Sequence, residues 1–244
     1  MDKSPPIQTM TIISADPLRR QRPCWNEATP HSRPYMAALL NYRNKTICGG
    51  FLVGCQWVMT SARCKISGFN TVVVLGAHDL WANESAQEHY LVEQAYQHEN
   101  YMFQNNTFSN DILLLKLLSK VRLSKNIQPL PLPTSSRDLS EGTLCSVAGW
   151  SPYQDDCKFM LYEANASIYD RSKCQKFYPK IDYGKICAGN REDDSQLFIQ
   201  GEMGDPLVCN GVAHGILSYR NPCPPAVYTH IAEYIPWIEE TMAK

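Results

Sequence analysis

The sequence lacks the features that define several broad classes of protein. No uninterrupted apolar run reaches the roughly 18 to 20 residues that a membrane helix needs, and the most apolar segment, Ile112 to Leu118, is short and contains Lys116. Neither charge is in excess, because 23 lysines and arginines stand against 24 aspartates and glutamates. Because no apolar run is long enough, we expect no membrane span. Because the basic residues are dispersed and balanced by acidic ones, we expect no nucleic acid partner.

Signatures of metal and cofactor binding are missing as well. The histidines show neither H-E-x-x-H nor paired-ligand spacing, and the glycine pairs have no phosphate-loop context. The acidic segment Arg191 to Asp194 lacks the ligand spacing of a calcium loop. We therefore predict that the protein uses no metal and no cofactor.

Cysteine, in contrast, is abundant. The ten cysteines have no C-x-x-C spacing typical of structural zinc, so disulfides in an oxidising compartment are the better interpretation. Four N-x-[ST] sequons, which are candidate glycosylation sites, point to the same compartment: Asn44, Asn83, Asn105 and Asn165. Residues 1 to 22 contain no apolar signal-peptide core. We expect a secreted or secretory-granule protein whose signal peptide is not visible in this sequence.

Short apolar or alternating runs recur along the chain and predict strands. They fall at Tyr35 to Leu39, Trp57 to Thr60, Thr71 to Leu75, Asp111 to Leu117, Thr143 to Ala148, Asp205 to Cys209, Val212 to Ser218 and Ala226 to Ile231. A proline-containing stretch in the middle of the chain divides them into two all-β halves, about 28–120 and 121–232. Helical spacing predicts a short C-terminal helix over about 234–243. Residues 1–27 receive no fold and are expected to be flexible.

Several segments carry motifs that occur together in one family, and they follow one another in that family's order. These segments are Pro30 to Ala37, Cys48 to Val53, Trp57 to Cys64, Asn110 to Leu117, Val147 to Trp150, Gly204 to Cys209, Gly211 to Tyr219 and Pro225 to Thr229. With them, residues 28–244 resemble a chymotrypsin-fold (S1 family) serine protease of the granzyme, mast-cell protease and cathepsin G branch. The resemblance implies an all-β fold of two six-stranded antiparallel barrels with the active site between them.

Catalysis in that family requires a serine nucleophile, a histidine base and a buried aspartate. The histidine of the family motif T-A-A-H-C is replaced by Arg63, whose guanidinium stays protonated and cannot accept a proton. The serine of the motif G-D-S-G-G-P is replaced by Met203, whose thioether is no nucleophile for acyl transfer. Only Asp111 matches the family's triad, and we expect it to form an ion pair with Arg63.

The activation machinery of the family has changed too. The segment Arg22 to Trp25 stands where the family has its mature Ile-Ile-Gly-Gly terminus, and Glu202 replaces the aspartate that this terminus would pair with. Gly201 and Met203 remain as the two backbone N–H donors of an oxyanion hole. Because the activating ion pair is lost, we expect this remnant of the hole to be unformed or reset.

The positions of the specificity pocket fall on Leu197, Ser218 and Arg220. Leu197 at the base of the pocket is neither the aspartate of tryptic enzymes nor a small residue. Arg220 replaces a glycine beside which a substrate lies as an added strand, so a bulky cation would obstruct that edge.

The resemblance also implies three disulfides, namely Cys48 with Cys64, Cys145 with Cys209 and Cys174 with Cys187. A fourth bridge between Cys157 and Cys223 is a hypothesis, because both lie in loops that flank the specificity pocket in this fold. Cys24 has no assigned partner, and Cys55 is most simply a buried small hydrophobic residue.

These substitutions predict a catalytically inactive serine protease homologue that acts as a monomer by binding another protein, such as a protease, an inhibitor or a receptor. The alternative is a serine endopeptidase with residual or unconventional activity, which requires an intact oxyanion hole. A third possibility is a gene copy that is losing its function. The retained core motifs and family cysteines argue against extensive decay.

Overall fold

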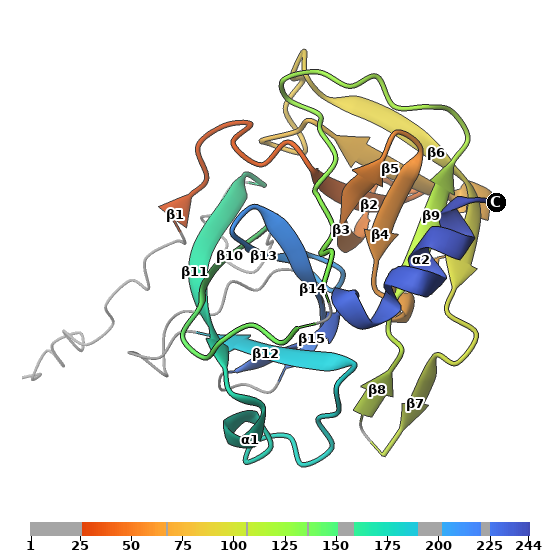
Figure 1. Cartoon of the computed structure of the whole chain (residues 1–244). Coiled ribbons are helices and arrows are strands. Elements are labelled where there is room, and N and C mark those ends of the chain that lie inside the picture. The colour runs from red at the N-terminus through yellow and green to blue at the C-terminus, as the bar shows by residue number, and fades with distance from the viewer. Residues whose placement is uncertain are drawn as a thin grey trace, which may run out of the picture.

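The first barrel is built from six antiparallel strands. A computed structural model describes residues 26–66, 68–105, 107–135, 137–150, 159–189, 202–220 and 225–244. The six strands are β2 (Met36–Asn41), β3 (Thr46–Gly54), β4 (Trp57–Thr60), β5 (Thr71–Leu75), β6 (Glu88–Gln97) and β9 (Leu113–Leu117). They are hydrogen-bonded in the order β2-β3-β4-β9-β6-β5 and close on themselves (Figure 1).

The second barrel repeats this architecture. Its strands are β10 (Leu144–Trp150), β11 (Leu161–Tyr169), β12 (Lys185–Gly189), β13 (Pro206–Cys209), β14 (Val212–Arg220) and β15 (Ala226–His230). The order is β11-β10-β13-β14-β15-β12, and pairing of β11 with β12 closes it. The prediction of two six-stranded barrels is thus confirmed. The short strand β1 (Asn26–Glu27) also pairs with β11, so ordered structure begins before residue 28. The rest of the segment expected to be flexible, residues 1–25, lies outside the described residues.

The remaining elements lie around the barrels. They are the hairpin of β7 (Met102–Gln104) and β8 (Thr107–Ser109), the 3-10 turns η1 (Ala62–Cys64), η2 (Gly68–Asn70) and η3 (Ile231–Tyr234), and the helices α1 (Arg171–Cys174) and α2 (Ile235–Met242). The predicted C-terminal helix is α2, with Pro236 in its first turn, where a proline needs no N–H partner. It lies against the first barrel, where Trp237 donates to Glu99 at 3.1 Å. No described helix is long and apolar enough to cross a membrane.

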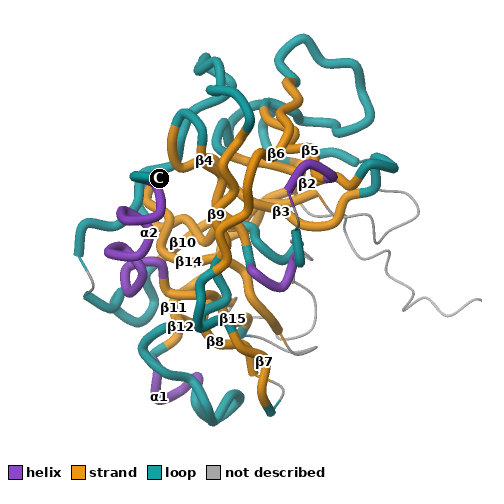
Figure 2. Tube along the Cα trace, turned by 90° about the vertical axis from the view of Figure 1, so that its right-hand side faces the viewer, coloured by secondary structure: helices purple, strands orange, loops and turns teal. Residues whose placement is uncertain are grey.

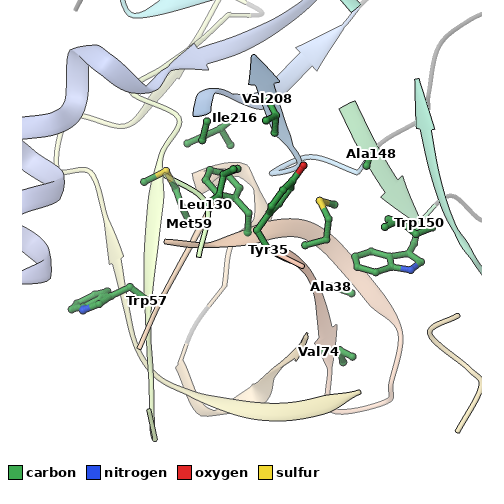
Figure 3. Packing of buried hydrophobic residues seen from close by; sticks show 14 of the residues in the cluster. Tyr35, Ala38, Trp57, Met59, Val74, Leu130, Ala148, Trp150, Val208 and Ile216 are labelled. Atoms are coloured by element: carbon green, nitrogen blue, oxygen red, sulfur yellow. The ribbon is translucent and has the colours of Figure 1, made fainter. Parts of the chain in front are cut away.

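Apolar side chains fill each barrel and also the space between the two. A large cluster joins Met59 and Val74 of the first barrel to Val208 and Ile216 of the second, with Leu130 from the connecting segment among them (Figure 3). Leu130 is 3% exposed and Ile216 0%. Because such close-packed contacts resist sliding, the barrels hold a fixed relation to each other, and residues at their boundary are held in place from both sides.

The three disulfides implied by the resemblance are present. They join Cys48 to Cys64, Cys145 to Cys209 and Cys174 to Cys187, over separations of 16, 64 and 13 residues. In the chain-entropy account each of the shorter loops contributes about 3 kcal/mol. Cys24, Cys157 and Cys223 lie outside the described residues, so the bridge between Cys157 and Cys223 stays a prediction. The expectation of a buried Cys55 is wrong: the residue is exposed, because it lies in the turn between β3 and β4.

Candidate functional site

A buried carboxylate lies where the two barrels meet. Asp111 precedes β9 and is 1% exposed. Its Oδ1 accepts hydrogen bonds from the Ser61 hydroxyl at 2.7 Å and from the Arg63 backbone N–H at 3.0 Å. Its Oδ2 accepts from the Ser218 hydroxyl of β14 at 2.5 Å. Both oxygens are thus satisfied by donors from opposite barrels.

Burial and hydrogen bonding act on Asp111 in opposite directions. Burial raises the pKa of Asp111 above its ordinary value, while the bonds from Ser218, Ser61 and the Arg63 backbone and the charge of Arg63 oppose the rise. The hydrogen bonds from these neutral donors therefore offset the cost of burying the Asp111 carboxylate.

The Arg63 side chain turns away from this carboxylate. Its Nη1 donates to the Ser218 carbonyl at 2.6 Å, and its guanidinium carbon lies 4.0 Å from the centre of the Phe108 ring. The expected ion pair with Asp111 is replaced by a backbone contact, because the turn η1, capped by the Ser61 side chain, directs the Arg63 N–H at the carboxylate. The guanidinium instead stacks on an aromatic face, as arginine commonly does.

Phe108 belongs to an aromatic surface that the sequence analysis missed. It stacks on Phe103 with ring centres 4.5 Å apart and lies 5.9 Å from Tyr219 of β14. These three residues form what we call the aromatic rim, and Phe103 is 58% exposed. The hairpin of β7 and β8 carries the rim across to the second barrel (Figure 2). The two phenylalanines before Asp111 were the available signal in the sequence.

The segment around Met203, which the sequence analysis aligned with the family's serine motif, packs on the first barrel. The Met203 carbonyl accepts from the Gly49 N–H at 3.0 Å, and the Met203 side chain contacts that barrel's core cluster. Burial raises the pKa of the neighbouring Glu202 to about 7. Gly201 lies outside the described residues, so the remnant of an oxyanion hole stays a prediction.

Asp205 is a second acidic residue in this segment that the sequence analysis did not single out. It is 3% exposed, and neither carboxyl oxygen has a hydrogen-bond partner among the described residues. Burial raises its pKa well above the ordinary value, and the charge of Glu202 raises it further. The signal in the sequence was the aspartate at the second of the adjacent glycines in G-D-S-G-G-P. Burial of this kind favours the neutral form of an acid over the ionised form, and the backbone N–H of Glu202 acts in the opposite direction.

The remaining candidate residues are partly placed by the structure. Ser218 is 2% exposed and engaged with Asp111, while Arg220 ends β14 opposite Ala226 and is partly exposed. Leu197 lies outside the described residues. All four sequon asparagines are exposed, namely Asn44, Asn83, Asn105 and Asn165. The part of the chain that the structure describes holds no group of three or more His, Cys, Asp or Glu arranged for a metal ion.

Two closed barrels with this junction between them are the architecture of a chymotrypsin-fold serine protease homologue. The trypsin family model matches residues 24–238. The chain is 39% identical to human cathepsin G over 88% of this chain and 85% of that protein. It is 40% identical to bovine duodenase-1, over 90% and 88% of the two chains. The structure of mouse neuropsin, a serine protease, superposes with a TM-score of 0.78 at 36% identity, over 89% of this chain and 98% of that one. The chain therefore belongs to the trypsin family.

The buried acid Glu202 predicts a dependence of stability on pH. Its pKa is about 7 in the folded chain against an ordinary 4.5, so between these values the folded state holds a proton that the unfolded state has released. The free energy of unfolding should therefore fall as pH rises from about 4.5 to about 7, by at most about 3 kcal/mol for this group. The raised pKa of Asp205 acts in the same direction.

Urea unfolding at a series of pH values measures this effect. Glu202→Gln should flatten the fall, whereas Glu240→Gln, at an exposed position on α2, should leave it unchanged. Equal pH profiles for the wild type and Glu202→Gln would show that Glu202 is not buried as an acid.

Proposed function

We propose that this chain is a catalytically inactive member of the trypsin family, secreted or stored in secretory granules, that acts by binding another protein. The observation that carries the proposal is the state of Arg63. A residue at the position of the general base must accept a proton, and a guanidinium has no lone pair to do so. Here it also donates to the Ser218 carbonyl.

The position of the Arg63 side chain supports inactivity in a second way. The Ser218 carbonyl lies on β14, in the stretch that β13 no longer covers. A peptide that bound alongside β14 as an added strand would need this carbonyl as an acceptor. Because Arg63 already donates to it at 2.6 Å and rests on Phe108, an incoming chain would first have to displace the guanidinium.

The surroundings of Met203 support the same proposal. A thioether offers no transferable proton and no nucleophile for acyl transfer. Burial raises the pKa values of two nearby acids, Glu202 and Asp205, above those of ordinary carboxyl groups. The three disulfides favour an oxidising compartment, in agreement with secretion or granule storage.

Reversion of the two altered positions tests the loss of catalysis. We expect no peptide turnover above background from the wild type, from Arg63→His or from Met203→Ser, because base and nucleophile act as a unit. A panel of fluorogenic peptides with different residues before the scissile bond, assayed beside an active trypsin-family protease, provides the measurement. The double variant then shows whether other residues also prevent catalysis. If it turns over peptides, Arg63 and Met203 account for the loss of activity. If it shows no turnover, Glu202 and Arg220 are disabling as well.

Wild-type turnover that co-purifies with the folded chain would contradict the proposal. A contaminating protease is recognised by a control variant, Asp111→Asn, prepared in the same way. Activity that is equal in both preparations belongs to the contaminant, and activity lost in the variant belongs to this chain.

The aromatic rim is the surface that we propose for partner binding. Phe103 is more than half exposed, and aromatic residues are enriched at protein interfaces. Stacking of Phe103 on Phe108 makes the surface rigid before it binds. The partner we propose is a protease, an inhibitor or a receptor.

Replacing one rim residue should weaken that binding selectively. We expect Phe103→Ser to lower the affinity for the partner by at least about tenfold, as the loss of a central aromatic anchor does. Phe69→Ser is the matched control, because Phe69 is 67% exposed on η2 and makes no ring contact with the residues of the rim. Quantitative affinity selection from secreted proteins, followed by titration of each retained protein, measures the difference. Equal affinity of a partner for the wild type, Phe103→Ser and Phe69→Ser would show that the binding surface lies elsewhere.

A further inference from the structure

A groove opens at the boundary of the two barrels, and none of its lining residues belongs to the Asp111 site. It is open to solvent along much of its surface and has a volume of about 420 Å³, which is room for a few sugar rings lying on it. The floor is apolar, with Leu130 and Val208 buried in the cluster between the barrels. Leu144 on one wall is 70% exposed, so the groove leaves apolar surface uncovered.

Polar groups line the edge of this groove in a fixed arrangement. Arg33 donates to Glu163 at 2.9 Å and to the Ser146 hydroxyl at 3.1 Å. Asn165 of β11 lies directly opposite Ser146 of β10, so the two side chains share one face of the sheet. That face is the one that carries the groove, and Asn165 is itself a lining residue. An apolar floor with a few fixed polar groups is the composition of a ligand site.

We propose that Asn165 carries an N-linked glycan and that its first sugars occupy this groove. Asn165-Ala166-Ser167 is a sequon, and Asn165 is exposed. Sugar rings are amphipathic: their C–H faces suit the exposed surface of Leu144, and their hydroxyls suit the side chains of Arg33 and Asn210. The glycan covers the apolar surface that the fold leaves open.

The donor of the glycan in this reaction is an oligosaccharide linked to a lipid diphosphate. The Asn165 side-chain nitrogen forms a bond to the anomeric carbon of the first sugar. The bond from that carbon to the diphosphate oxygen breaks, the lipid diphosphate leaves, and the amide loses one proton. The transferase acts in the secretory pathway, the oxidising compartment that the three disulfides favour.

The other three sequons do not place a glycan beside this groove. Asn44 and Asn105 lie in hairpin turns, with φ of 56° and 51°, and Asn83 lies in an exposed loop. None of the three lines the groove. A glycan on any of them would extend into solvent, so a stabilising effect specific to Asn165 distinguishes the proposal from glycosylation in general.

Site-specific analysis of the full chain, secreted from a glycosylating host behind that host's leader, tests the proposal. Peptide mass spectrometry should find Asn165 occupied. Hydrogen exchange should be several-fold faster at the amides of Leu130, Asn210 and Gly211 in variants that lack this sequon, and Tm should fall by about 2 to 4 °C. Asn165→Gln and Ser167→Ala both remove the sequon, and the second retains the Asn165 side chain.

Asn83→Gln is the matched control, because it removes an exposed sequon outside the groove and should change neither exchange nor Tm. An unoccupied Asn165 in the secreted, folded chain would overturn the proposal. An occupied Asn165 whose loss leaves exchange at the groove unchanged would overturn the seating of the sugars. A change that is equal in Asn83→Gln would show a general effect of glycosylation.

Discussion

The buried carboxylate of Asp111 is the contact on which the junction of the two barrels depends. It collects a hydroxyl and a backbone N–H from the first barrel and the Ser218 hydroxyl from the second, while its own carbonyl accepts from Thr229 of β15 at 2.8 Å. Each of these donors would cost about 1 to 3 kcal/mol if it were buried unpaired. The same arrangement that could orient a catalytic base therefore has a structural use that survives without one.

The arginine at position 63 has consequences at the junction of the two barrels. Arginine is longer than histidine and carries a planar cation, so its side chain reaches past Asp111 to the β14 carbonyl and the face of Phe108. This contact is a second link between the two barrels, in addition to the buried hydrogen bonds of Asp111. The Arg63 side chain thereby occupies this part of the junction, and the aromatic rim beside it is the surface that we propose for partner binding.

Much of the fold could be predicted from the sequence, and less of the site. Motifs in family order predicted the two barrels, but the apolar pattern along the chain missed four of the barrel strands: β3, β6, β11 and β12. In β6 a bulge near Val92 breaks the alternation, and β11 includes the exposed Asn165. Residue types identified Arg63 and Asp111. The direction of the Arg63 side chain depends on the local turn η1 and also on Phe108, which comes from a hairpin more than forty residues further along the chain and cannot be inferred from the residues around Arg63.

Reaction with a broad fluorophosphonate tests the loss of a working nucleophile most directly, because the probe needs an activated hydroxyl but little substrate recognition. The secreted, disulfide-intact chain should show no adduct in its intact mass after incubation beside an active trypsin-family protease that labels fully. A stoichiometric adduct on the folded chain, absent after denaturation before treatment, would contradict the assignment of Arg63 and Met203 as disabling and would require another nucleophile in the cleft.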